Sequence, residues 1–262
     1  MSDDDTILSS IEGKIARITL NNPDKLNVFT IERMQRLIDI FDEIQQNPKV
    51  RCVIINAMGE RAFCAGLDKA MLSSGDPDIN SKILDVGTAL SKKIFYTPQF
   101  VVGSIAAPAI GWGCILSMLC DFRYVLDNAY FKLPEVELGI FPATGALTLC
   151  MAHFGPSLGE EMLFLSRKLS AEEGARIGFV NGVGTTREEI DDLANETAEK
   201  LSLLNQQVTM YTKMNARMMH AIEYGKALDL EAQCFKEMLE LKKEKNWFEI
   251  CLERFRAMRE SR

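Results

Sequence analysis

Histidine is scarce in this chain of 262 residues, which contains only His153 and His220. Zinc and non-haem iron sites usually draw on several imidazole or thiolate ligands, and the seven cysteines here lack paired ligand spacing. The sequence therefore predicts no bound catalytic metal. Because the number of cysteines is odd and most lie in apolar runs, we expect reduced core residues. A reducing compartment, most simply the cytoplasm, follows from that expectation.

Long apolar runs and strong basic clusters are also missing. No stretch reaches the roughly 18 consecutive apolar residues of a membrane span, and the acidic start MSDDD does not resemble a secretory signal. The net charge is −7, with lysine and arginine mostly scattered singly, so neither nucleic acid nor a membrane is an expected partner. With 47% hydrophobic residues the chain can bury a sizeable core, as one large domain or one domain with a tail.

The first hundred residues alternate between strand and helix patterns. Residues 6–10 and 14–20 predict a hairpin, and Thr30 is a suitable N-cap for a helix with one apolar face up to Ile44. Residues 53–56 form a continuous apolar run, typical of a strand buried on both faces. The order strand, helix, strand predicts an α/β fold.

Later segments extend this pattern and then change character. We expect a mobile polar loop over 73–81, a helix over 82–94 and a buried strand over 100–105. After about residue 185 the apolar positions repeat at helical spacing, which predicts three amphipathic helices over 188–204, 207–224 and 228–258. Such helices must bury their apolar faces against the rest of the chain or another subunit, so we expect an oligomer.

Two glycine-containing stretches are suited to binding a negatively charged oxygen. Gly111, Trp112 and Gly113 open an apolar helix, and the first N–H groups of a helix have no intrahelical partners. Ala65 and Gly66 are small enough for a ligand to approach the main chain closely, and the N–H of the next residue, Leu67, is a second candidate donor. The alternative is an ordinary buried helix entered through a glycine turn.

Five sequence blocks in a fixed order resemble the crotonase family, also called enoyl-CoA hydratase/isomerase. The blocks are LNNPDKLNVFT (20–30), AFCAGLDKA (62–70), AIGWGCILSMLCD (109–121), FKLPEVELGIFPATG (131–145) and LSAEEGARIGFVNGV (169–183). The resemblance implies an α/β fold built as a spiral of ββα repeats, here residues 1–190, followed by a C-terminal helical region, residues 191–262. It further implies acyl-CoA thioester substrates, no other cofactor, and a homotrimer or dimer of trimers.

The same resemblance assigns roles to individual residues. The N–H groups of Leu67 and Trp112 match the oxyanion hole for the thioester oxygen, with Gly66 and Gly111 beside them. Lys25 and Lys69 lie in blocks that border the CoA nucleotide, although either lysine can equally be a solvated surface residue. Asp68 lies next to this site, but an acidic residue in the first turn of a helix is its simpler interpretation. Trp112 is larger than the residue usual at its position.

The acid/base residues distinguish the reactions of this family. Hydratases hold water between two glutamates, at the positions of Ile115 and Glu135, and an aliphatic Ile115 cannot exchange a proton. Glu135 alone suffices to move a double bond, as in Δ3,Δ2-enoyl-CoA isomerases, with Glu137 as the competing carboxylate. Three hypotheses follow: an enoyl-CoA isomerase using Glu135, another crotonase-type reaction such as weak hydration or thioester hydrolysis, and an inactive acyl-CoA-binding protein.

Overall fold

The computed structural model describes residues 6–74 and 76–241. In chain order its elements are β1 (Ile7–Glu12), β2 (Ile15–Leu20), the 3-10 helix η2 (Pro23–Lys25), α1 (Ile31–Gln46), β3 (Cys52–Ala57), α2 (Lys69–Leu72), α3 (Pro77–Phe95), β4 (Phe100–Ile105), β5 (Ala109–Ile110), α4 (Trp112–Leu119), β6 (Phe122–Leu126), β7 (Tyr130–Lys132), α5 (Ala146–Phe164), β8 (Leu169–Ser170), α6 (Ala171–Arg176), β9 (Gly182–Gly184), α7 (Arg187–Leu203) and α8 (Gln206–Leu241).

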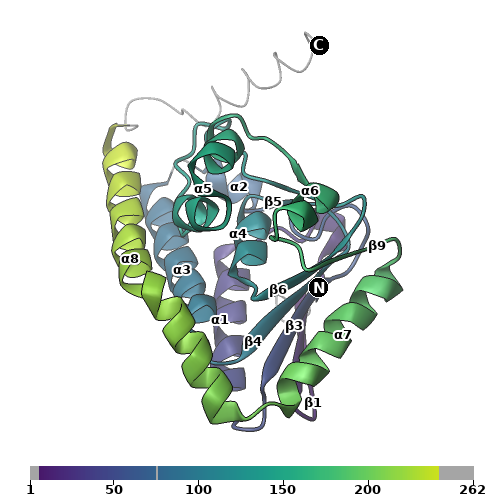
Figure 1. Cartoon of the computed structure of the whole chain (residues 1–262). Helices are drawn as coiled ribbons and strands as arrows, with labels where there is room; N and C mark the ends of the chain where they lie inside the picture. Colours follow the sequence, from purple (N-terminus) through teal and green to yellow (C-terminus); the bar gives the residue numbers. More distant parts are fainter. Residues whose placement is uncertain (1–5, 75, 242–262) are drawn as a thin grey trace.

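A six-stranded sheet with the order β1-β2-β3-β4-β6-β9 forms the centre of the fold (Figure 1). Only the hairpin pair β1/β2 is antiparallel, and the remaining neighbours are parallel. Side chains of β3 alternate between the two faces: Val53 and Ile55 join the main core with α1, whereas Cys52 and Ile54 pack against α7. The continuous apolar run of β3 is therefore explained by burial on both faces.

Three successive units of the chain have the same order of elements. Each begins with a long strand of the six-stranded sheet, continues with a short strand or a single β-bridge, and ends with a helix. β4 leads through β5 into α4, and β6 leads through β7 into α5. After β3, Cys64 makes a single bridge to Ala109 of β5 before the chain enters α2 and α3. β5, β7 and β8 form a second, three-stranded sheet. This arrangement confirms the α/β fold with ββα repeats.

The structure confirms the strands and helices that were predicted for the first half of the chain, with one correction. The hairpin, the strands over 53–56 and 100–105 and the helix capped by Thr30 are all present, and the Thr30 side chain accepts from the Arg33 N–H. The predicted loop over 73–81 is wrong in its second part, because α3 already begins at Pro77. The Asp76 side chain caps this helix and proline occupies its first turn, which are ordinary helix-start signals.

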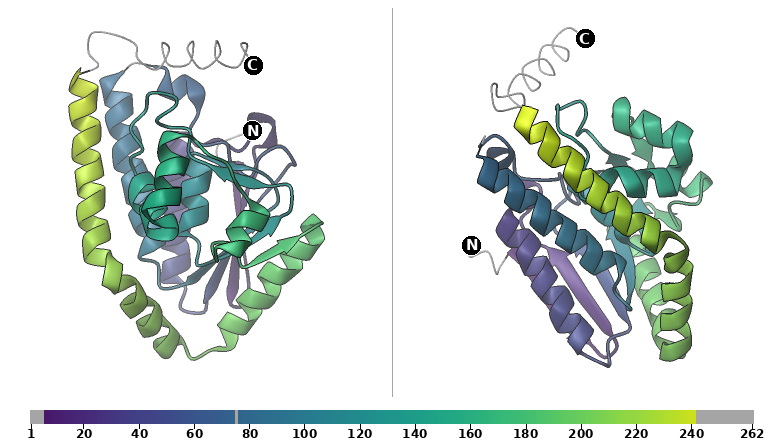
Figure 2. Two further views of the ribbon diagram at one scale, coloured as in Figure 1. Left: turned by 45° about the horizontal axis from the view of Figure 1, so that its top comes forward. Right: turned by 90° about the vertical axis from the view of Figure 1, so that its left-hand side faces the viewer.

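The C-terminal prediction of separate helices over 207–224 and 228–258 is also wrong within the described residues. One helix, α8, runs from Gln206 to Leu241, and residues 242–258 lie outside the described part. Gly225 lies inside α8, where a Cβ would come 3.7 Å from the Tyr96 hydroxyl at the end of α3. The helix is therefore continuous through a glycine, a residue that lowers helix stability, in a region where α8 packs against α3. Figure 2 shows α8 running beside α3.

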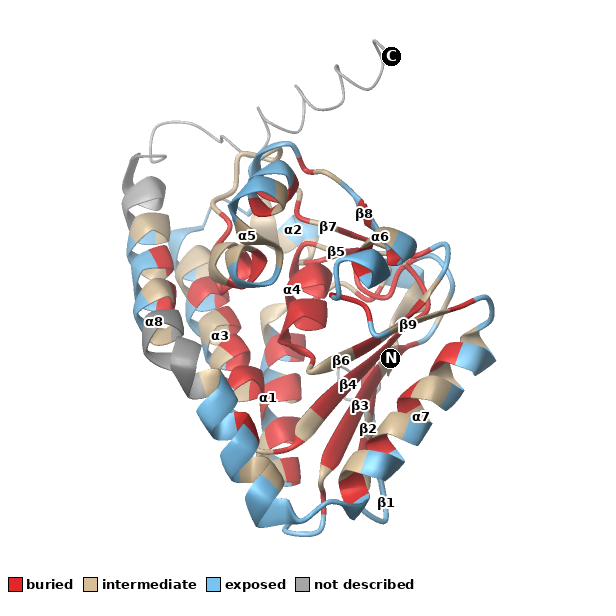
Figure 3. Cartoon of the chain, in the orientation of Figure 1, coloured by how far each residue is buried: buried red, intermediate tan, exposed pale blue. Residues whose placement is uncertain are grey.

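Burial is concentrated in the central strands and in α4, whose eight residues are all buried (Figure 3). The outward face of α7 is exposed, as expected for a helix that covers a sheet. The six cysteines of the described part are free, and five of them are buried. None of the described helices has the length and apolar character needed to cross a membrane. The division between residues 190 and 191 stays a prediction and falls inside α7.

Candidate active site

The start of α4 is held against the segment that follows β3. The Ile110 N–H donates to the Cys64 carbonyl at 2.9 Å, and the Gly111 N–H donates to the Lys132 carbonyl at 2.9 Å. Gly111 has φ 54° and ψ −120°, which disfavours residues with a side chain. At Gly113 a Cβ would lie 2.3 Å from the Cys64 carbonyl oxygen, so only glycine permits this close approach. These two glycines fix the position of the Trp112 amide.

The Leu67 amide lies on the same side of this junction. The Gly66 carbonyl accepts from the Phe29 N–H, and the Asp68 N–H donates to the Phe29 carbonyl, both at 2.8 Å. Since successive residues of an extended segment present their N–H groups to opposite edges, the Leu67 N–H faces away from Phe29. A Cβ on Gly66 would lie 3.5 Å from the Trp112 nitrogen. In the described chain, neither the Leu67 nor the Trp112 N–H donates to a protein acceptor.

Leu67 and Trp112 both line a cavity of about 110 Å³. Its walls come from residues 65–67, from the start of α4, from α3, from the loop between β7 and α5, and from Phe235 of α8. Most of the lining side chains are aliphatic or aromatic. Among the described residues that line it, Glu135 is the only ionisable one. The cavity can therefore enclose an apolar group beside one carboxylate and two main-chain donors.

Glu135 lies in a turn that directs its carboxyl group to Gly111. The Ile140 N–H closes the turn by donating to the Glu135 carbonyl at 2.8 Å, and Glu135 Oε1 would lie 3.1 Å from a Cβ on Gly111. The residue is partly exposed overall, but Oε2 is buried without a hydrogen-bond partner in the described part. Burial raises the pKa of Glu135 to about 7, opposed by its own backbone N–H and by Lys132.

Glu137, the competing carboxylate, has a different environment. Its Oε2 pairs with Lys132 Nζ at 2.9 Å, and Glu137 does not line the cavity. The intervening turn separates the two glutamates, which an extended segment would have placed on one side. Ile115, 2% exposed, supplies an aliphatic wall of the same cavity. The site therefore combines one enclosed carboxyl group with an apolar residue at Ile115.

The Trp112 indole reaches from α4 toward α3. The ring is 2% exposed and makes an edge contact with Phe29, with the ring centroids 5.2 Å apart. At Gly87 of α3, a Cβ would lie 3.5 Å from Trp112 Nε1 and 2.8 Å from Thr144 Cγ2. The missing side chain at Gly87 thus leaves room for both groups. Trp112 and Thr144 also line the cavity.

The remaining candidate residues divide into two groups. Ala65, Gly66 and Gly111 line the cavity together with Leu67, Trp112 and Ile115. Asp68, by contrast, caps α2 by accepting from the N–H groups of Ala70 at 2.9 Å and Met71 at 3.1 Å. Lys25 and Lys69 are exposed and do not line the cavity. The structure therefore brings together the main-chain candidates but not the two lysines.

Several cavity residues were missed by the sequence analysis. Asn80 was assigned to a loop, although the Asp-Pro pair before it signals the helix that positions it. Phe235 comes from α8, 100 residues after Glu135 in the sequence, and no local pattern connects the two. Its contribution depends on how α8 is anchored to the rest of the fold.

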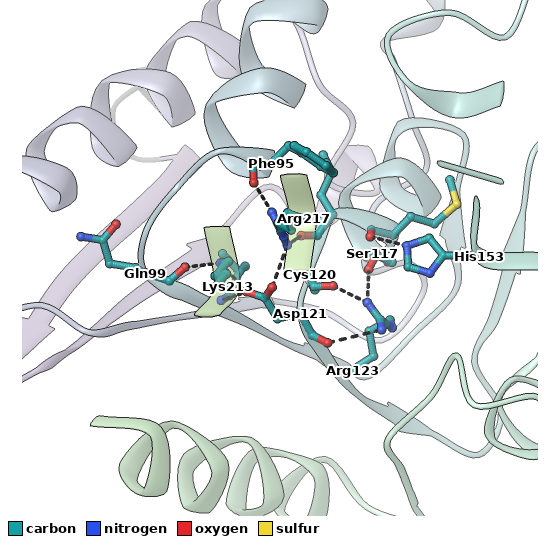
Figure 4. Close-up of polar contacts among 12 residues, drawn as sticks. Phe95, Gln99, Ser117, Cys120, Asp121, Arg123, His153, Lys213 and Arg217 are labelled. Carbon is teal, nitrogen blue, oxygen red and sulfur yellow. Dashed lines mark hydrogen bonds and ion pairs between the residues drawn. The ribbon is translucent and has the colours of Figure 1, made fainter. Parts of the chain in front are cut away.

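A buried ionic cluster anchors α8 (Figure 4). Asp121, which follows α4, pairs with Lys213 and with Arg217, each at 2.7 Å. Burial alone would raise the pKa of Asp121, but the two cations outweigh that effect and lower it. Further along α8, the Glu231 carboxylate accepts from the Gly145 N–H at 2.7 Å at the start of α5. These contacts fix the helix that carries Phe235.

A family model described as enoyl-CoA hydratase/isomerase matches residues 10–259. The chain is similar to a short-chain-enoyl-CoA hydratase of Clostridium acetobutylicum, with 30% identity over 72% of each chain. It is also similar to a crotonyl-CoA hydratase of Syntrophomonas wolfei, with 27% identity over 88% of each.

Solved structures show the same fold. A crystal structure of an enoyl-CoA hydratase/isomerase from Mycobacterium paratuberculosis superposes with a TM-score of 0.86 at 25% identity. That match covers 95% of this chain and 98% of the other. A second structure, an enoyl-CoA hydratase from Bacillus halodurans, has a TM-score of 0.85 at 21% identity and covers 95% and 99% of the two chains.

Proposed function

The chain belongs to the enoyl-CoA hydratase/isomerase family, and we propose that it is an enoyl-CoA isomerase that converts 3-enoyl-CoA into 2-enoyl-CoA thioesters. Glu135 takes a proton from C2 of the acyl group and returns it to C4. Between these steps the electrons of the broken C–H bond are shared with the thioester oxygen as an enolate. The N–H groups of Leu67 and Trp112 hold that oxygen.

The observation that carries this proposal is the carboxyl group of Glu135, which is the only one among the described residues that line the cavity, together with the aliphatic Ile115 in the same lining. Isomerisation needs one group that accepts and then returns a proton, and it adds no water. Enclosure raises the pKa of Glu135 to about 7, which suits a group that must both accept and donate near neutral pH. Fixed main-chain donors stabilise an enolate most effectively where water is excluded.

The coenzyme A part of the thioester substrate would contact residues outside the cavity. Lys25 and Lys69 are exposed on the segments that flank Ala65–Leu67, where their cations can meet the phosphates of coenzyme A. Asp68 positions this segment by capping α2. In this proposal coenzyme A belongs to the substrate, and the reaction requires no separate cofactor.

The test compares Glu135→Gln with wild type in the conversion of a 3-enoyl-CoA to its conjugated 2-enoyl thioester. Because glutamine cannot accept the proton, we expect kcat to fall by about 10²-fold or more. Glu137→Gln is the matched control, since Glu137 pairs with Lys132 outside the cavity, and it should retain nearly full activity. Wild-type activity in Glu135→Gln would refute the assigned role.

Hydration is the second candidate, because both curated relatives named above are called hydratases. Among the described residues that line the cavity, only Glu135 is a carboxylate, so we expect slow water addition. If isomerisation is the main reaction, crotonyl-CoA hydration by wild type will be slower than isomerisation, and Ile115→Glu will raise it. Binding of CoA esters without any turnover would instead identify an inactive acyl-CoA-binding protein.

A further inference from the structure

A buried carboxylate joins α8 to the start of α5. Glu231 of α8 is 3% exposed, and one of its carboxylate oxygens accepts from the Gly145 N–H at 2.7 Å. The other oxygen accepts from the Thr148 N–H at 2.9 Å and from the Thr148 hydroxyl. Gly145 is the N-cap residue of α5 and has no side chain that could bind the Thr148 N–H, the usual partner of a capping group. Glu231 therefore caps α5 from another helix.

The residue before this cap has a strained backbone. Thr144 has φ 59°, a left-handed conformation that is unfavourable for a β-branched residue. Its carbonyl accepts from the buried Ser91 hydroxyl of α3 at 2.6 Å, and the next N–H group, of Gly145, donates to Glu231. Strain of this kind persists only where the surrounding contacts determine the conformation. The turn at Thr144 is therefore held between α3 and α8.

These contacts lie beside the wall of the cavity. Thr144 lines the cavity, and so does the partly buried Phe235. Phe235 follows Glu231 by four residues, so the two side chains lie on one face of α8, about one turn apart. α8 contacts both α3 and α5 (Figure 1). The wall thus contains one side chain from the turn before α5 and one from α8, and Glu231 links the two segments by hydrogen bonds.

We propose that Glu231 is a positioning residue for acyl selectivity. By holding α8 on the turn at Thr144, it keeps Phe235 in the wall, and the closed wall disfavours long acyl groups relative to short ones. A longer chain has to displace the Phe235 ring or leave its last methylene groups in water. This inference rests on the proposed acyl-CoA function, because it assigns the apolar cavity to the acyl group, but it does not depend on the isomerase reaction.

Binding of saturated acyl-CoA esters tests the inference without catalysis. The probes are butanoyl-CoA and octanoyl-CoA, and the measured quantity is the ratio of their two dissociation constants by calorimetry. In Phe235→Ala this ratio should shift toward octanoyl-CoA by about tenfold, as for a small change in the size of an apolar pocket. Glu231→Gln should shift it in the same direction by a smaller factor. The single amide oxygen of glutamine cannot accept from both Gly145 and Thr148 on the two sides of the group.

Two further variants control for indirect effects. Asp229→Asn makes the same change from carboxylate to amide on α8, in an exposed pair with Lys92, and should keep the wild-type ratio. Phe235→Leu should give a smaller shift in the same direction, which provides the measurement if Phe235→Ala does not fold. In the double variant Glu231→Gln/Phe235→Ala the two shifts should be less than additive, because both changes open the same part of the wall.

The outcomes separate this inference from the proposed function. A purely structural role for Glu231 predicts a lower midpoint in urea with an unchanged ratio. That result, or an unchanged ratio in the Phe235 variants, would overturn the inference and leave the isomerase assignment untouched. Shifted ratios in a protein without isomerase activity would support the inference and refute the proposed reaction. Failure of wild type to bind either ester would overturn both.

Discussion

At the scale of single residues, the enclosure of Glu135 has two opposite effects. A carboxyl group shielded from water holds its proton more tightly, which makes its conjugate base stronger but less populated at low pH. The backbone N–H of Glu135 and the neighbouring Lys132 partly oppose this shift, and Lys132 also pairs with Glu137. Burial is the largest of the effects on Glu135 and raises its pKa to about 7, which leads to a specific pH dependence.

The pH profile follows from the form of Glu135 that accepts a proton. Only the carboxylate is active as a base, so kcat/KM should rise about tenfold per pH unit below pH 7 and level off above it. Stopped assays of 3-enoyl-CoA conversion between pH 5 and pH 9 measure this profile. Lys132→Gln should move the inflection to higher pH, because it removes a cation that favours the carboxylate. A flat profile from pH 5.5 to pH 8 would contradict the assignment.

At the scale of elements, the site depends on how closely α4 approaches the segment after β3. Both candidate N–H donors lie at this junction, and both are main-chain groups. The side chain of Leu67 therefore does not matter for hydrogen-bond donation by its N–H group. What matters is the distance between the backbone of α4 and the backbone of the segment after β3. Gly113 is the residue that permits this distance.

Gly113→Ala tests the junction. A Cβ 2.3 Å from the Cys64 carbonyl forces α4 away from Leu67, so we expect the free energy of unfolding to fall by roughly 1–3 kcal/mol or more. We also expect kcat to fall about 10²-fold, as for loss of one oxyanion donor. Urea unfolding and the isomerase assay measure the two effects. Gly225→Ala in α8 is the control, because its Cβ would make only an ordinary contact with the Tyr96 hydroxyl at the end of α3, so stability should be unchanged or slightly higher.

The anchoring of α8 is a second property of elements. Asp121 is the common partner of Lys213 and Arg217, and the Lys213 side chain is 4% exposed. Asp121→Asn leaves these cations without their counter-charge, so we expect a loss of about 3–5 kcal/mol in unfolding free energy. Asp229→Asn removes a partner of Lys92 in an exposed pair and should cost less than about 1 kcal/mol. Similar midpoints in urea for the two variants would disprove the anchoring role.

At the scale of the whole molecule, many large apolar side chains on the C-terminal half remain exposed. They lie at the end of α5 and around the junction of α7 and α8: Phe164, Leu165, Leu203, Leu204, Val208 and Tyr211. A group of exposed apolar side chains, such as the one around the junction of α7 and α8, is typical of a contact between proteins. We propose that a homotrimer or dimer of trimers covers the group at this junction.

Light scattering after gel filtration tests the assembly. We expect a particle mass of three or six times 29.4 kDa. Leu203 is 80% exposed, so Leu203→Glu should leave the fold intact and shift the population toward smaller species by placing a charge in the contact. Leu8→Glu, on the edge strand β1, is the matched control and should keep the wild-type mass. A wild-type monomer at micromolar concentration would refute the prediction.

Local signals were enough for much of the fold and for part of the site. Thr30 as a cap, the alternating pattern of the hairpin and the doubly buried β3 are short-range properties, and the structure confirms them. The glycines around Trp112 predicted a helix start there, which the structure also contains. The misplaced start of α3 at Pro77 was recoverable from Asp76 and the proline, whereas the continuity of α8 was not.

The sequence by itself determined which chemical groups are available: one glutamate after Pro134, an aliphatic residue at 115, and glycines where backbones must approach. These features depend only on residue type and on the neighbouring backbone, so they can be predicted from the sequence. The tertiary structure alone decided that Glu135 rather than Glu137 enters the cavity, that Trp112 Nε1 is buried without an acceptor in the described part, and that Phe235 completes the wall. The burial of Trp112 and the position of Phe235 depend on contacts between segments far apart in the chain, and the cavity that Glu135 lines is formed by such segments.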